Sequence, residues 1–235
     1  MKKNRFTSYL LYALGEILLV VVGILIAVLL NNSNNQSKLD RIEELSIVRL
    51  SEDLKDDINR YDFLDFRISE RIHLCDSTLN LIKSQKSLDE RLGIISIHQI
   101  NFFLVESNTT TYDEMLNTGR LYSMKDKELR TQVIKYYRDV NKWSTYIERD
   151  NQQIRSKMIQ PNYNDYWVLQ EDIWDGQVIN TQKYPWLLST YSREIKDIEA
   201  LIDQAEDGFR SSKKHIGYLK RQAEELLLKI AKDEL

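Results

Sequence analysis

Residues 9–30 read YLLYALGEILLVVVGILIAVLL. Fifteen of them are Leu, Ile or Val. Each of these favours membrane insertion by roughly 0.3 to 0.6 kcal/mol, whereas one acidic residue near the centre of a span costs about 3 kcal/mol. As a helix the segment is about 33 Å long, enough to cross a hydrocarbon core of roughly 30 Å. The stretch therefore predicts a transmembrane helix. The polar sequence NNSNNQ follows it where a signal peptide would have small residues, so we expect an uncleaved anchor.

The flanks of this span indicate its orientation. Lys2, Lys3 and Arg5 precede it, whereas the first basic residue after it is Lys38. Positive charge is enriched on the cytoplasmic side of a membrane. We therefore expect residues 1–8 to form a cytoplasmic stub and the rest of the chain to lie outside the cytoplasm.

One face of the span carries small residues and a carboxyl group. Helical spacing brings together Ala13, Glu16, Val20, Gly23 and Ala27. Small residues let helices approach closely, and a polar group inside a membrane needs a partner. We expect a helix–helix interface on this face. Two alternatives stay open: Glu16 titrates in a proton- or ion-coupled complex, or it only reaches back to the lipid headgroups.

Composition limits the class of the domain that follows. The 235 residues include only seven Gly and two Pro, whereas sandwiches, barrels and doubly wound folds need more turn residues. The net charge is −3, and residues 1–37 carry +2, so the remainder carries −5. An acidic domain with scattered basic residues is a poor binder of nucleic acid.

The next segment is expected to be a long helix over residues 38–86. Residues 31–37 contain neither Pro nor Gly, so they form a polar tether or continue the helix. One apolar seam repeats every seven residues, and a second accompanies it. The seams consist of Ile47, Leu54, Tyr61, Ile68, Cys75 and Ile82, and of Leu50, Ile58, Leu64, Ile72 and Leu79. Between the seams lie Glu52, Asp53, Asp56 and Asp57, which we interpret as a solvated face.

Shorter elements are predicted in the middle of the chain. The sequences at Ser87–Glu90 and Thr111–Glu114 both have the pattern of a capping box, which opens a helix. Gly119 is placed to end the second of these helices. The apolar stretch Ile94–Val105 favours a short buried helix over a strand.

Two more long helices are expected, over residues 126–160 and 189–232. The first ends at Pro161, and its stripe consists of Leu129, Val133, Tyr136, Val140, Trp143, Ile147, Ile154 and Met158. The second alternates apolar steps of three and four, as in a coiled coil or bundle. Its seam consists of Ile195, Ile198, Ile202, Ala205, Phe209, Ser212, Ile216, Leu219, Ala223, Leu226 and Ile230. Each long helix has one apolar stripe, so the stripes must pack together. The predicted fold is all-α: an N-terminal transmembrane helix, then an elongated antiparallel, coiled-coil-like bundle over residues 38–235.

Residues 161–188 form an irregular connector rich in aromatic side chains. The aromatic patch consists of Tyr163, Tyr166, Trp167, Trp174, Tyr184 and Trp186. These residues could line a ligand pocket, lie at a membrane interface, or pack the connector onto the bundle.

The sequence contains no catalytic signature. It lacks a glycine-rich phosphate loop, G-x-S-x-G, H-E-x-x-H and a calcium loop. The single cysteine, Cys75, excludes an internal disulfide, and His73, two residues before it, points to another side of a helix. We therefore expect no catalytic residues, no metal site and no cofactor.

Two segments resemble an uncharacterised family of single-span envelope proteins from Gram-negative bacteria. They are YLLYALGEILLVVVGILIAVLLNN, residues 9–32, and TYDEMLNTGRLYSMKDKELRTQVIKYY, residues 111–137. The resemblance implies an inner-membrane protein with a periplasmic domain and adds no mechanism.

Together these features predict a non-enzymatic, membrane-anchored helical protein. It would act through protein–protein contact with copies of itself or with another membrane protein. The alternatives are a subunit of a proton- or ion-coupled complex that uses Glu16, and an extracytoplasmic sensor module.

Overall fold

The computed structural model describes residues 4–84, 87, 92, 100, 102–189 and 191–233. It is 85% helix, and no strand occurs among the described residues, so the predicted all-α class is confirmed. The elements in chain order are α1 (Asn4–Lys83), α3 (Thr110–Asn117), α4 (Arg120–Ser123), α5 (Lys127–Met158), the 3-10 helix η1 (Pro161–Tyr163), α6 (Asn164–Trp174), the 3-10 helix η2 (Pro185–Leu188) and α7 (Arg193–Asp233). Residues 88–90 of the capping box predicted at Ser87–Glu90 and most of Ile94–Val105 lie outside the described residues.

The chain divides into two compact units, Met1–Leu50 and Ser51–Leu235. The first consists of α1 alone, and every side chain from Tyr9 to Leu39 is exposed. By length and composition, α1 contains the one membrane-spanning candidate among the described residues. The helix also continues through residues 31–37, where the Ser37 hydroxyl donates to the Ser33 carbonyl oxygen at 3.0 Å. Since this stretch lacks Pro and Gly, nothing in it interrupts helical hydrogen bonding.

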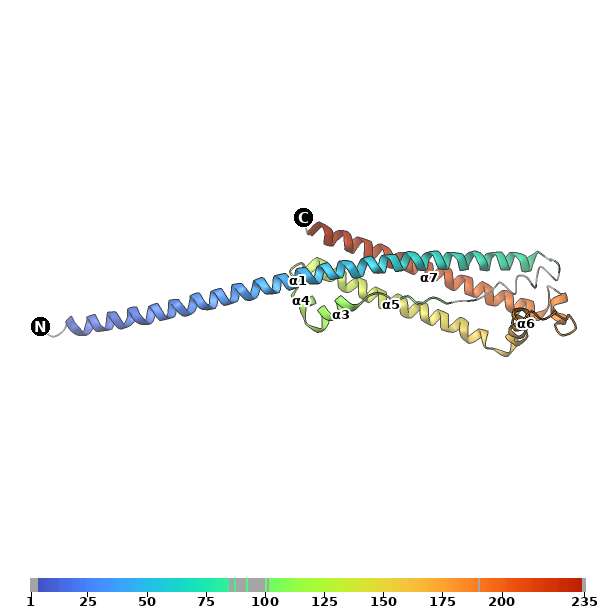
Figure 1. Cartoon of the computed structure of the whole chain (residues 1–235), viewed down its shortest axis with the longest axis horizontal. Coiled ribbons are helices and arrows are strands. Elements are labelled where there is room, and N and C mark those ends of the chain that lie inside the picture. Colours follow the sequence, from blue (N-terminus) through green and yellow to red (C-terminus); the bar gives the residue numbers. More distant parts are fainter. Residues whose placement is uncertain are drawn as a thin grey trace. The chain divides into compact units, whose positions relative to one another are not determined.

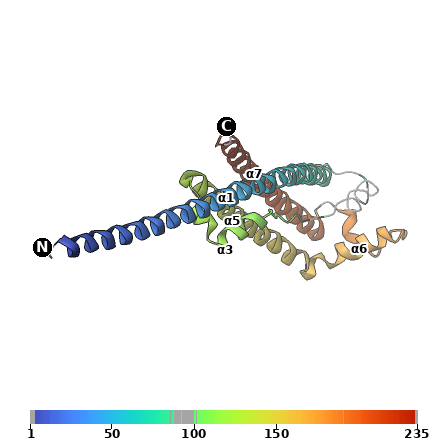
Figure 2. The ribbon, with the colours of Figure 1, turned by 60° about the vertical axis from the view of Figure 1, so that its left-hand side comes forward.

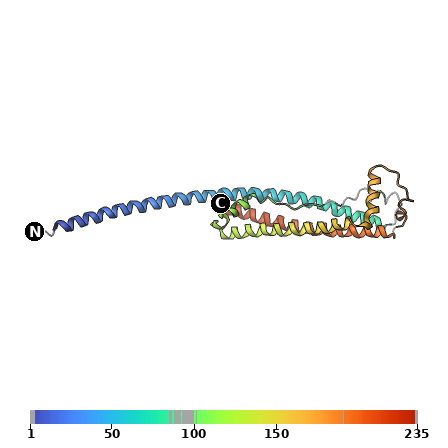
Figure 3. The same ribbon diagram turned by 90° about the horizontal axis from the view of Figure 1, so that it is seen from below.

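The core of the second unit is built from the seams of α1, α5 and α7, which lie side by side (Figures 1 and 3). Removing one Leu, Ile or Phe side chain from water contributes roughly 1.5 to 3 kcal/mol. The most buried seam residues include Leu54, Tyr61 and Ile68 on α1, Leu129, Val133 and Tyr136 on α5, and Ile202, Ala205, Leu219 and Ala223 on α7. The predicted apolar periodicity therefore marks the buried faces of all three helices.

Helices α5 and α7 run in opposite directions along each other. Lys229 forms an ion pair with Glu128 at 3.0 Å. Farther along α5, Trp143 stacks on His215 with ring centroids 3.8 Å apart. At the far end, a Cβ added to Gly208 would lie 3.1 Å from Ile154 Cδ1. The absence of a side chain at Gly208 therefore lets the two helices approach closely there.

Ion pairs also link α1 to α7, and these two helices likewise run in opposite directions. Asp62 pairs with Lys220, Asp76 with Arg210 at 3.1 Å, and Lys83 with Glu199 at 3.8 Å. Exposed pairs of this kind contribute about 0 to 1 kcal/mol each. They align the register of the two helices, whereas the buried seams supply the stabilisation.

The connector between α5 and α7 holds η1, α6 and η2. Pro161 is the first residue of η1, and α5 has ended by then because proline cannot continue a helix. Gly176 adopts a positive φ of 70° just after α6. Figure 2 shows the chain passing from α5 into α6 and returning by a loop to α7, and α6 lies crosswise to both long helices in Figure 3.

Residues 102–109 form an extended segment along α5, not a helix. The Asn151 side chain donates to the Phe103 carbonyl oxygen at 3.2 Å, and the Tyr137 hydroxyl donates to the Asn108 carbonyl oxygen at 3.2 Å. The two α5 positions are fourteen residues apart, about 21 Å along the helix. Five residues span at most about 18 Å, and the side chains of Tyr137 and Asn151 supply the rest of the distance.

Candidate functional site

Two buried carboxylates on α1 form the centre of the candidate site. Asp53 and Asp57 lie one helical turn apart, and their exposed fractions are 8% and 0%. Both were predicted to lie on a solvated face, and that prediction is wrong. The steps from Leu50 to Leu54, Asp57 and Tyr61 are four, three and four residues, so Asp57 occupies a seam position. The position of this acidic residue within an apolar seam is the sequence signal that would have revealed its burial.

Asp53 caps a helix that belongs to another part of the chain. Its Oδ2 accepts from the backbone N–H of Thr111 at 3.1 Å, and its Oδ1 accepts from the Asn108 side chain at 2.8 Å. Thr111 lies in the first turn of α3, where helix N–H groups lack partners and the helix dipole favours an anion. The capping box predicted at Thr111–Glu114 is therefore wrong, because α3 begins at Thr110 and α1 supplies the acceptor.

Asp57 accepts hydrogen bonds from two other elements. The backbone N–H of Asn108 donates to Oδ1 at 2.8 Å, and the Tyr136 hydroxyl of α5 donates to Oδ2 at 2.7 Å. The Tyr136 hydroxyl also contacts that of Tyr61 at 3.1 Å, which in turn contacts the hydroxyl of Ser107. We call this group the carboxylate cluster; its members are Asp53, Asp57, Tyr61, Ser107, Asn108, Thr111 and Tyr136.

Burial shifts the proton equilibria within the carboxylate cluster. It raises the pKa of Asp57 above the ordinary value of 3.8, and the hydrogen bonds from Tyr136 and Asn108 oppose this rise. Burial also raises the pKa of Tyr61 to about 12 and shifts the pKa of Tyr136 upward. Both phenols therefore stay protonated at neutral pH and remain able to donate.

The hydrogen bonds of the carboxylate cluster join separate elements of the second unit. Each carboxylate receives two donors, from the extended segment, α3 or α5, so its charge is stabilised by polar hydrogens. Removing one partner from such a buried network costs about 1 to 3 kcal/mol, because the other partner is left unsatisfied. The cluster thus holds α1, the extended segment, α3 and α5 in one arrangement.

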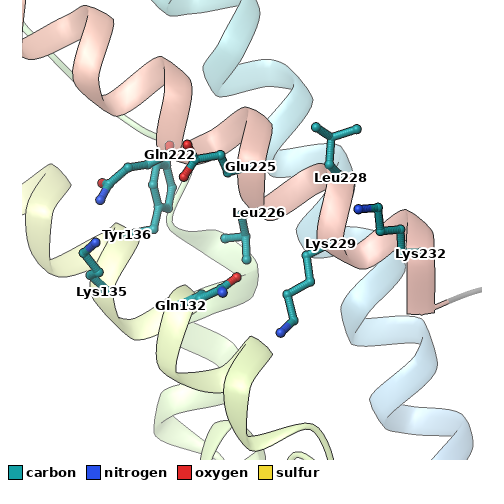
Figure 4. Close-up of a pocket in the computed structure, with 9 residues that line it drawn as sticks. All are labelled: Gln132, Lys135, Tyr136, Gln222, Glu225, Leu226, Leu228, Lys229 and Lys232. Carbon is teal, nitrogen blue, oxygen red and sulfur yellow. The ribbon is translucent and has the colours of Figure 1, made fainter.

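A pocket of about 570 Å³ lies between α5 and α7, and the Tyr136 ring forms part of its wall (Figure 4). Lys135, Lys229 and Lys232 surround it, and Glu225 lies among them. The remaining lining residues are Gln132, Gln222, Leu226 and Leu228. The pocket therefore offers charged and hydrogen-bonding side chains beside two leucines.

The predicted membrane interface lies entirely on α1. Ala13, Glu16, Val20, Gly23 and Ala27 are all exposed within the single chain. A Cβ added to Gly23 would meet no atom within 4 Å. Within the first unit, the face is therefore exposed.

The aromatic patch divides between buried and exposed positions. Tyr163, Tyr166, Tyr184 and Trp186 are buried, Trp167 is half-buried and Trp174 is exposed. Several of the polar atoms bond within the second unit. The Tyr163 hydroxyl donates to the Asp197 carbonyl oxygen at 3.2 Å, Trp167 Nε1 donates to the Met158 carbonyl oxygen at 2.7 Å, and the Tyr184 hydroxyl donates to Asp172 at 2.6 Å. The first two contacts attach the connector to α7 and α5, and the third lies within the connector. None of the six aromatic residues lines the pocket described above.

The cysteine and the histidines that the structure describes lie apart from the carboxylate cluster. Cys75 is buried, and burial raises the pKa of its thiol to about 12, which suppresses the reactive thiolate. His73 is exposed, and His215 stacks on Trp143. Among the described residues, no group of three His, Cys, Asp or Glu side chains could hold a metal ion.

Residues 16–158 match a family model described as "Family of unknown function (DUF6090)". The chain belongs to the DUF6090 family. The DUF6090 match begins within the apolar stretch of α1, contains the whole carboxylate cluster and ends with α5 at Met158. No curated protein and no solved structure matches the chain.

The structure gives a physical meaning to the second segment that carried the resemblance, Thr111–Tyr137. Its first residue donates a backbone N–H to Asp53, and Tyr136, near its end, donates to Asp57. Tyr137 stacks on Tyr112 with ring centroids 4.2 Å apart and anchors Asn108. In this DUF6090 protein, both ends of the segment therefore meet the carboxylate cluster.

Proposed function

We propose that this DUF6090 protein is a non-enzymatic, membrane-anchored helical protein that acts as an oligomer through protein–protein contact. One observation carries the proposal: the apolar stretch of α1 is exposed along its whole length and has small residues with one carboxyl group on a single face. In a membrane, association of such helices depends on close packing and on hydrogen bonds between them. Val20, Gly23 and Ala27 provide the surface for packing, and Glu16 provides the hydrogen-bonding group.

We further propose that the anchor lies in the inner membrane of a Gram-negative bacterium, with residues 38–235 as an elongated antiparallel bundle in the periplasm. The asymmetry of the flanking charges supports this orientation. The opposed directions of α5 and α7 support the bundle. A reporter that works only outside the cytoplasm, fused after Leu235, should be active. Activity of a cytoplasmic reporter at the same position would overturn the orientation.

Cysteine crosslinking tests the helix–helix interface in the full chain. In a Cys75→Ala background, single cysteines at positions 20, 23 and 27 should crosslink two copies strongly. Cysteines at positions 18, 22 and 25 lie on other faces and serve as controls, so they should crosslink weakly. The Gly23→Leu substitution adds bulk at the centre of the face and should reduce crosslinking at positions 20 and 27. Equal crosslinking from all six positions would contradict the proposal.

The alternative function, proton or ion coupling, rests on the same Glu16. A carboxyl group inside a membrane span is costly, and such groups often mark ion or proton pathways. Glu16→Gln separates the two functions because glutamine keeps hydrogen-bonding capacity but cannot titrate. If the protein acts only through protein–protein contact, crosslinking and the cellular phenotype should survive this change. Loss of the phenotype with crosslinking intact would favour coupling.

A further inference from the structure

A groove of about 490 Å³ runs beside the extended segment on the α5 side of the second unit. One wall consists of Phe103, Leu104, Val105 and Glu106. The α5 wall consists of Ser144, Thr145, Ile147, Glu148, Arg149 and Gln152. The hydrogen bonds from Asn151 and Tyr137 hold the extended segment to α5 on either side of this opening. We call it the α5 groove.

The backbone of the extended segment has the properties of a lone β-strand. Its side chains alternate in burial: Val105 is buried, whereas its neighbours Leu104 and Glu106 are exposed. No hydrogen bond occurs at the backbone groups of Leu104, Val105 or Glu106 within the part of the chain that the structure describes. An extended backbone with unpaired N–H and C=O groups is a template for another strand.

Two side chains indicate what such a strand should carry. Leu104 is 57% exposed and offers an apolar surface to a cross-strand neighbour. On the opposite wall, Glu148 Oε1 accepts from Arg155 at 3.1 Å and from Gln152 at 3.2 Å, and the Glu148 side chain is 32% exposed. A partly exposed carboxylate at the wall of a groove favours a cationic donor from the occupant.

We propose that the α5 groove binds an extended peptide strand of a partner protein, with a lysine or arginine side chain that donates to Glu148. The strand would pair with the backbone of residues 104–106 and place an apolar side chain against Leu104. This inference rests on the proposed function, since it supplies a second protein contact, separate from the one within the membrane.

Binding of synthetic peptides to the full chain in detergent tests the proposal. The probe is a fluorescent peptide of alternating valine and threonine with one central lysine, and anisotropy reports its binding. A glutamate in place of the lysine should weaken binding about tenfold or more, as expected for a change of charge beside a partly buried carboxylate. A central proline should abolish binding, because it removes a backbone donor. Equal binding of all three peptides, or no saturable binding up to about 1 mM, would overturn the proposal.

Variants of the chain locate the site. Leu104→Pro removes one backbone N–H that has no partner in the free protein, and proline suits an extended segment, so the fold should persist. This variant should lose the lysine peptide, whereas Leu104→Ala should retain most of the binding. Glu148→Gln should remove the preference for lysine over glutamate, and the remote Glu171→Gln should not change it. A lysine preference that survives Glu148→Gln would count against the site.

Two further results separate this proposal from its rivals. A peptide with this chain's own sequence at residues 101–107 should bind more weakly than the lysine peptide. If it binds more tightly, the occupant is a second copy and the proposed partner chemistry is wrong. Crosslinking at positions 20, 23 and 27 is independent of these peptides. Absence of peptide binding with crosslinking intact would therefore contradict only the proposal for the α5 groove. Absence of crosslinking with peptide binding intact would contradict only the proposed membrane interface.

Discussion

Asp57 places a carboxyl group in an apolar seam of α1, and we expect this residue to make stability depend on pH. Its pKa is raised in the folded chain, so between the ordinary value of 3.8 and the raised value the folded state binds more protons than the unfolded state. The free energy of unfolding should therefore fall as the pH rises through this window. The Asp57→Asn variant cannot titrate and should lack this part of the slope.

Urea unfolding of residues 38–235, measured between about pH 4 and pH 7, checks this prediction. The wild type should lose free energy of unfolding as the pH rises, and the Asp57→Asn variant should lose less. The difference in stability between the two proteins should therefore shift in favour of the variant with rising pH. The exposed neighbour provides the control, since Asp56→Asn should follow the wild-type profile. Asp57→Ala should lower the free energy of unfolding by about 2 to 4 kcal/mol, because it leaves the Tyr136 hydroxyl and the Asn108 N–H without an acceptor. Parallel profiles for the wild type and Asp57→Asn would show that Asp57 does not titrate in this range.

At the scale of elements, α3 depends on α1 for its N-terminal cap. Thr111 finds its acceptor on Asp53, so an eight-residue helix, too short to be stable alone, is fastened by a contact that is distant in sequence. Asp53→Ala should lower the free energy of unfolding by about 1 to 3 kcal/mol, as expected for loss of a cap and of a buried acceptor. Asp53→Asn retains one acceptor oxygen and should cost less.

Amide hydrogen exchange gives the local readout for Asp53. Exchange at Thr111 should accelerate in Asp53→Ala, while exchange in the middle of α7 stays slow. Glu52→Ala removes an exposed acidic residue next to Asp53 and should leave the exchange at Thr111 unchanged. Unchanged exchange at Thr111 in Asp53→Ala would mean that α3 does not need this cap.

At the scale of the whole molecule, we expect residues 38–235 to be soluble and strongly helical without the apolar stretch of α1. The seams of α1, α5 and α7 bury one another within the second unit, so this domain carries its own core. Far-UV circular dichroism should show strand content below about a tenth, against roughly 20 to 25% in ordinary domains. Aggregation of this fragment, or a larger strand signal, would contradict the bundle.

The long helices could be predicted from the sequence because their signals are local. Unbroken apolar periodicity at steps of three and four marks the buried face of a helix wherever its partner lies, as the seam from Ile195 to Ile230 shows. The apolar stretch at residues 9–30 likewise identifies a spanning candidate by length and composition alone.

The environment of polar side chains was decided by tertiary structure. Asp53 and Asp57 look like members of a solvated face until the extended segment and Tyr136 pack against them and supply donors. Residues 102–109 are extended because their hydrogen-bond partners, Tyr137 and Asn151, lie about 21 Å apart on α5. Helical periodicity is a property of neighbouring residues, whereas the burial of a carboxylate depends on what lies across from it in space. The sequence by itself therefore determined the helices, and only their packing decided where the buried charges and the extended segment lie.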